Sequence, residues 1–238
     1  MGFKVAKTWP VQALTLLLPS IGWAGFETGV GLDINRDLYD SGTSLSPTSM
    51  GTGVLLRSPN RWWFRDRFAL RADATLGASW GQDRVEWRAY QATVPVYSED
   101  HGTTLTTAGV MLGPEISPWA SESASPYFGA QLGMIWARHW HRFDEDDARL
   151  MGLASATDGL HPYTTQTTPA VDLHGGVRFE LPGRLAMEVE AGYNVAFMRQ
   201  ARLAQAPKAL EAIRTAYGLN QMRLGVSLVI PLVTGTES

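Results

Sequence analysis

Ionisable residues recur at nearly every second position between residues 170 and 197, and these side chains could do chemistry together. An esterase needs a nucleophile, a base and an orienting acid within hydrogen-bond reach. His174 has Asp172 two residues away and Glu190 on the next segment, but we interpret it as a structural histidine. Ion pairing is the other chemistry that the set allows. The set comprises Asp172, His174, Arg178, Glu180, Glu188 and Glu190.

The remaining histidines are the other candidate bases or metal ligands, at His101, His139, His141 and His161. His139 and His141 fall on one strand face and precede an acidic run at 144–147, which could hold Ca²⁺ or a transition metal. No serine stands near them in a His-x-Ser arrangement, and an acidic loop is more often a solvated surface. The sequence therefore predicts no catalytic residue, no metal site and no cofactor.

Apolar and polar residues alternate on both sides of Pro182-Gly183. Side chains on a strand alternate faces with period two, whereas a helix would mix the two sets. Pro-Gly between two such runs is a turn signal. The segment is therefore predicted to be a β-hairpin with one apolar and one charged face.

Six further segments alternate in the same way, which gives eight strands in all. Short and long connections follow one another, so an up-and-down barrel would place short turns at one rim and long loops at the other. The fold class predicted is all-β, an eight-stranded antiparallel up-and-down transmembrane β-barrel, with a short helix within 207–217 of the last loop. The six segments are 26–34, 50–57, 68–80, 104–115, 127–140 and 220–232.

The N-terminal stretch 1–24 has the pattern of a cleaved secretory signal peptide. Lys4 and Lys7 precede an apolar run that ends at Gly22-Trp23-Ala24, with small residues at the recognition positions. We therefore expect residues 25–238 to form the barrel domain. The chain has no cysteine, so no disulfide contributes to its stability. Its net charge of −3 provides no electrostatic footprint for nucleic acid.

Aromatic residues gather toward both ends of the predicted strands, as in the two girdles of a membrane barrel. The apolar faces then point to lipid and the charged faces fill the lumen. We expect Arg71, Arg178 and Arg223 to pair with Asp73, Glu188 and Glu190, because a lone buried charge is costly. The predicted girdle residues are Trp62, Trp63, Trp80, Trp119, Trp136, Trp140 and Tyr193.

This architecture resembles the small eight-stranded outer-membrane barrels of Gram-negative bacteria, such as the OmpA transmembrane domain and the OmpX family. The resemblance covers nearly all of the chain after residue 24 and rests on architecture, not on a motif. It implies a place in the bacterial outer membrane, with outer-membrane lipid and the assembly machinery as partners. Such barrels usually end on an aromatic residue, whereas the last strand here ends at Val229-Ile230-Pro231-Leu232.

The function predicted is that of a non-enzymatic outer-membrane barrel with a charged, largely filled lumen and long extracellular loops. It would be structural, present its loops to partners, or form a narrow pore. One alternative is a lipid-modifying enzyme on the same barrel. Another is a soluble secreted barrel that binds a small apolar ligand, which would require the apolar faces to point inward.

Overall fold

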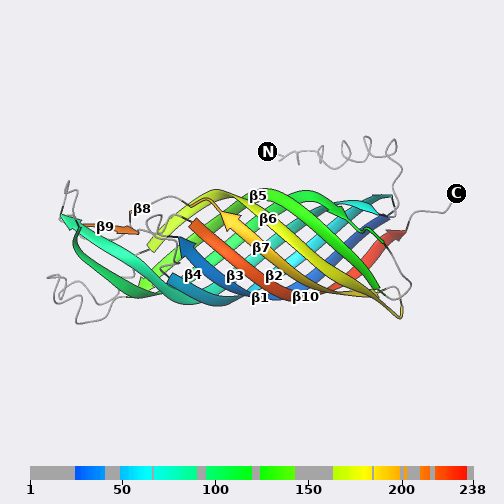
Figure 1. Cartoon of the computed structure of the whole chain (residues 1–238), viewed down its shortest axis with the longest axis horizontal. Coiled ribbons are helices and arrows are strands. Elements are labelled where there is room, and N and C mark those ends of the chain that lie inside the picture. The colour runs from blue at the N-terminus through cyan, green and yellow to red at the C-terminus, as the bar shows by residue number, and fades with distance from the viewer. Residues whose placement is uncertain are drawn as a thin grey trace, which may run out of the picture.

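Eight long strands form a closed barrel in the computed structural model (Figure 1). The structure describes residues 25–40, 49–65, 67–89, 95–119, 124–142, 163–183, 185–198, 201–202, 210–214 and 218–234. The long strands are β1 (Gly25–Asp40), β2 (Ser49–Arg65), β3 (Phe68–Ala89), β4 (Pro95–Ile116), β5 (Ala124–Arg142), β6 (Tyr163–Leu181), β7 (Leu185–Ala196) and β10 (Gly218–Thr234).

Each long strand pairs antiparallel with its neighbours, and the ring closes through β1–β10. Pairing of β2 with β3 completes the circle, so the eight-stranded barrel has no open edge through the membrane-spanning height. Gly25 lies opposite Thr234, so both ends of the barrel chain are at the short-turn end (Figure 1). The predicted fold class is confirmed. None of the described residues forms a helix long and apolar enough to cross a membrane.

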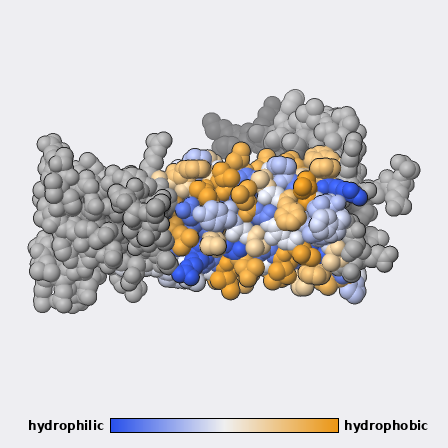
Figure 2. Space-filling view, viewed as in Figure 1, coloured by the Kyte–Doolittle hydropathy of each residue, from blue (hydrophilic) through white to orange (hydrophobic). Residues whose placement is uncertain are grey.

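The apolar face of the strands points outward and the charged face points into the barrel. On β1, Leu32 is 61% exposed while its neighbour Asp33 is 0% exposed. On β10, Leu224 is 61% exposed and Arg223 is buried. Apolar side chains cover much of the described wall in Figure 2. Exposure of so continuous an apolar surface to water would be unfavourable, so the exterior is that of a transmembrane barrel. The alternative of a soluble barrel with its apolar faces inward is therefore wrong.

The strands extend further than the alternation predicted. The turn between β2 and β3 is short, because β2 continues through Pro59 and Asn60 to Arg65. Pro59 is tolerated because no pairing with β1 is formed at that position, so its missing N–H is not needed there. The Pro182-Gly183 turn is confirmed, and Gly183 has a φ of 80°, a left-handed conformation that favours glycine.

Two short strands lie beyond the barrel at the long-loop end (Figure 1). They are β8 (Ala201–Arg202) and β9 (Leu210–Arg214). β9 pairs with the far end of β3, at Val85–Ala89, and β8 pairs with β9. The helix predicted within 207–217 is therefore wrong where the structure describes it. A free strand edge on β3 offers backbone hydrogen bonds that outweigh the local helical pattern.

Candidate functional site: the charged lumen

The lumen near the short turns and at mid-height is filled by four arginines, one histidine and six carboxylates. Strands all around the barrel supply them, so most of these groups meet partners across the interior and not only along their own strand. All are buried. The set, called the lumen network below, comprises Asp33, Arg57, Arg61, Arg71, Asp73, Glu115, Asp172, His174, Glu188, Glu190 and Arg223.

The part of the network nearest the short turns is centred on Arg61. Its Nε donates to Glu115 Oε1 at 2.6 Å, and its Nη1 lies 2.8 Å from Glu188 Oε1. The ring of Tyr127 lies 5.1 Å from the Arg61 Cζ, within cation–π range. Tyr127 lies near the short-turn end of β5, but it is 3% exposed and points inward. Its hydroxyl donates to Glu190 Oε2 at 2.9 Å.

Glu190 lies at the centre of the network. Arg71 Nη1 approaches Glu190 Oε2 at 2.6 Å, and Arg57 Nη1 and Arg223 Nη1 approach Oε1 at 3.0 and 2.5 Å. The single carboxylate of Glu190 therefore compensates part of the positive charge of three guanidinium groups. Arg71 also contacts Asp73 at 2.9 Å. Planar guanidinium groups can share carboxylates in this way, because each presents several N–H donors in a fixed fork.

His174 joins two carboxylates on the other side of the lumen. Its Nδ1 is 2.9 Å from Asp172 Oδ2 and its Nε2 is 3.4 Å from Glu115 Oε2. Asp172 also accepts from Arg223 Nη2 at 2.8 Å. Because both ring nitrogens face carboxylates, neither is directed at a hydroxyl that it could activate. The arrangement therefore fits the structural role predicted for His174.

Glycines in the wall make room for these large side chains. A Cβ on Gly192 would lie 2.6 Å from Arg223 Cζ, inside any normal contact distance. A Cβ on Gly225 would collide with Asp33. The inward-facing glycines of β7 and β10 therefore let the network groups lie flat against the backbone.

Two predicted network residues lie at the short-turn mouth. Arg178 contacts Glu27 at 2.5 Å and Glu180 at 2.7 Å. The side chain of Glu180 is 46% exposed, so it borders the lumen and does not fill it. Of the three arginines expected to pair in the lumen, Arg178 therefore pairs at the mouth, and Glu188 pairs with Arg61.

An apolar layer lies in the lumen on the long-loop side of the network and was not among the features predicted from the sequence. Leu105, Ile135 and Leu219 point inward and are almost fully buried, with small residues between them. Between this layer and the network lies a cavity of about 20 Å³, which suffices for about one water molecule. This cavity is therefore too small for a hydrated solute.

The aromatic residues occupy both ends of the outer wall, with one exception among those predicted. Trp80 and Trp119 are well exposed, Trp62 packs on Phe26 with ring centroids 5.3 Å apart, and Trp140 packs on Tyr163. Trp136 and Tyr193 are also exposed on the outer face. Trp63 follows the lumen-facing Arg61 by two residues, so it belongs to the inward set. Adjacent residues cannot share one strand face.

The described residues contain no group of three or more side chains that could hold a metal ion. His139 is buried and faces the interior. The side chains of His101 and His141, all of His161 and the acidic run 144–147 lie outside the described residues. The same is true of the predicted signal peptide 1–24.

Comparison with known proteins supports the fold. No family model and no curated protein matches the sequence. Neisserial surface protein A matches in structure with a TM-score of 0.51 at 13% identity, over 88% of this chain and 98% of that chain. OprG of Pseudomonas aeruginosa also matches, with a TM-score of 0.48 at 11% identity, over 86% of this chain and 96% of that chain. The Escherichia coli outer membrane protease OmpT matches with a TM-score of 0.43 at 8% identity, over 87% of this chain and 97% of that chain. At these identities the likeness shows the fold alone, and the fold is that of the small outer-membrane barrels.

Proposed function

We propose that this chain is an outer-membrane protein with a closed lumen, which acts through the structure it presents beyond the long-loop rim. The observation that carries the proposal is the double closure of the interior. The lumen network fills the barrel toward the short turns, and the layer of Leu105, Ile135 and Leu219 fills it toward the long loops. A diffusion pore would need the opposite, a wide water-filled lumen.

The long-loop end offers the structure to be presented. Pairing of β2 with β3 ends at Gly51–Gly81, and β4 pairs with β5 only as far as Gly102–Arg142. Beyond these positions β3 and β4 continue as a hairpin, with β9 alongside β3. Figure 1 shows this hairpin projecting past the barrel. An external partner would meet this projection first.

The apolar wall supports the location. Lipid must cover the wall, and a barrel satisfies every backbone group without a membrane-spanning helix. Export through a signal peptide at 1–24, with 25–238 as the barrel domain, and insertion by the outer-membrane assembly machinery are parts of the same proposal. The buried position of His139 and the two carboxylates on His174 favour a non-enzymatic role over a lipid-modifying one.

The test combines location, closure and conductance. The protein should sediment with outer membranes and migrate faster in gels when unboiled than when boiled. Purified protein in planar lipid bilayers should give no stable conductance steps, while a general porin in the same membrane reports the sensitivity. Reproducible steps from the folded protein would contradict the closed lumen. A soluble periplasmic protein without a mobility shift would contradict the membrane location.

A further inference from the structure

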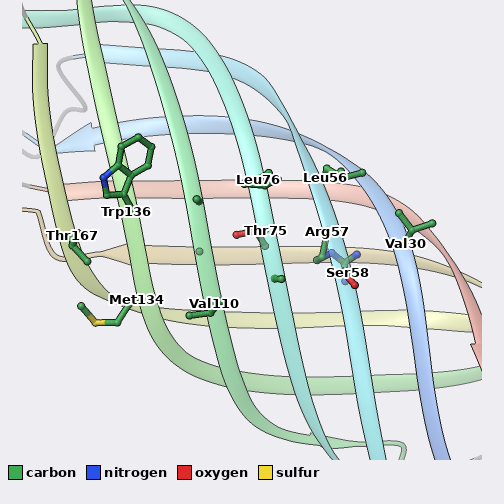
Figure 3. Close-up of a pocket in the computed structure, with 13 residues that line it drawn as sticks. Val30, Leu56, Arg57, Ser58, Thr75, Leu76, Val110, Met134, Trp136 and Thr167 are labelled. Carbon is green, nitrogen blue, oxygen red and sulfur yellow. The ribbon is translucent and has the colours of Figure 1, made fainter. Parts of the chain in front are cut away.

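An apolar groove of about 540 Å³ crosses the lipid-facing wall from β6 to β1 (Figure 3). Its floor is low because small side chains, Ala74 and Ala108, face outward there between larger neighbours. Trp136 and Met134 lie at one end and Val30 at the other, as the close-up shows. The volume is in the range of sites that hold small ligands.

A cation lies directly beyond the Trp136 end of this groove. Arg138 is on the same outward face of β5, two residues closer to the long-loop rim, so its Cα is about 7 Å from that of Trp136. Its Cζ is 4.0 Å from the Trp140 ring centroid and 4.1 Å from that of Tyr163. These two centroids are only 5.2 Å apart, so the rings lie side by side and not on opposite faces of the guanidinium.

Arg138 is therefore held by the two rings. Both rings lie within cation–π distance of the guanidinium, and no described carboxylate lies within ion-pair distance of it. Its Nε is buried and has no hydrogen-bond partner. The outer N–H donors of a guanidinium held in this way can contact a phosphate.

From this arrangement we infer that the wall carries a specific site for a phosphorylated, multiply acylated glycolipid of the outer leaflet, that is, for lipid A. One sugar phosphate binds Arg138 and one acyl chain lies in the groove past Trp136. The site rests on the proposed location in the outer membrane, because it lies at the long-loop rim, which faces the outer leaflet in such barrels. A glycerophospholipid of the inner leaflet would meet the opposite rim.

The test is native mass spectrometry of the detergent-purified protein titrated with lipid A, with lipid A lacking its phosphates, and with phosphatidylglycerol. Arg138→Gln removes the phosphate contact, and Ala108→Trp fills the groove. Each has a matched control on the same outer wall. Arg36→Gln changes another outward arginine toward the long-loop rim, on β1, and Ala191→Trp enlarges an outward alanine on β7, away from the groove.

We expect about tenfold weaker lipid A binding for Arg138→Gln and for Ala108→Trp, and little change for either control. Dephosphorylated lipid A should bind the wild-type protein about as weakly as lipid A binds Arg138→Gln. Equal binding by all variants would overturn the site, and equal binding of phosphatidylglycerol would overturn its assignment to lipid A. The unboiled gel mobility of every variant distinguishes failure of the lipid A site from failure of the proposed outer-membrane barrel. A protein that keeps the mobility shift but binds no lipid A is still a folded barrel, so that result would contradict only the lipid A site.

Discussion

Replacement of Arg71 by methionine should destabilise the barrel far more than replacement of a mouth arginine. Arg71 is fully buried and contacts Asp73 at 2.9 Å, Glu115 at 2.8 Å and Glu190 at 2.6 Å. Glu115 and Glu190 keep other arginines when Arg71 is lost. Arg71 is, however, the only cation among the described residues that pairs with Asp73, so Arg71→Met leaves one carboxylate buried and uncompensated.

Removal of one partner from a buried pair costs about 3–5 kcal/mol. The comparison is Arg178→Met at the mouth, which should cost less than Arg71→Met. The Arg178 and Glu27 side chains are 12% and 11% exposed and that of Glu180 is 46% exposed, so water can reach the groups that this substitution leaves behind. Adding Asp73→Asn to Arg71→Met should recover at least about 1 kcal/mol, because contacting groups couple by about 0.5–3 kcal/mol.

The assay is reversible urea unfolding of each variant in lipid vesicles, followed by tryptophan emission and by gel mobility. The slope of the free energy against urea concentration should stay constant, so that midpoints report stability. If Arg71→Met costs no more than Arg178→Met, or if Asp73→Asn gives no recovery in the Arg71→Met protein, the network does not act as a coupled set and the reasoning fails.

Three further outcomes are expected. Gly192→Leu places a side chain where the Arg223 guanidinium lies and should cost about 1–3 kcal/mol in urea unfolding, and a neutral result would show that Arg223 has room to move. Ile135→Ala in the apolar layer should cost about 2–5 kcal/mol, whereas the lipid-facing Leu132→Ala should cost clearly less; equal costs would argue against an apolar layer in the lumen. Gly183→Ala should lower stability by about 1 kcal/mol, because a Cβ is strained at a φ of 80°, and unchanged stability would mean that the turn can rearrange.

Strand periodicity predicted the barrel and the inward direction of most charged groups, because each face of a strand repeats every second residue. It failed where a local signal competed with tertiary pairing. The alternation was predicted only over 50–57 and 68–80, so Arg61 fell in the connection between them and was not placed in the lumen, although β2 continues to Arg65. The helical pattern near Leu210 was overridden by pairing of β9 with β3.

Some features of the site that were not predicted could have been predicted from the sequence. Leu105 has the same parity as Glu115 on β4, so the alternation itself places it in the lumen. Trp62 and Trp63 are adjacent and could not both face lipid. The choice of partners was beyond the sequence, because Glu190 meets Arg57, Arg71 and Arg223 across the barrel only in one register.

Accessibility along β10 tests the central claim most directly, that of an apolar wall around a filled charged interior. The chain has no cysteine, so single cysteines with a spin label can be placed from Met222 to Ile230 without background. For the protein in lipid bilayers, we expect Leu224→Cys, Val226→Cys and Leu228→Cys to be accessible to oxygen dissolved in lipid. We expect Ser227→Cys and Val229→Cys to be inaccessible to oxygen and to a water-soluble nickel reagent. Folding of each protein is checked by its gel mobility. Nickel access at Ser227 in a folded protein would show an open aqueous lumen, and loss of the two-residue alternation would contradict the barrel orientation itself.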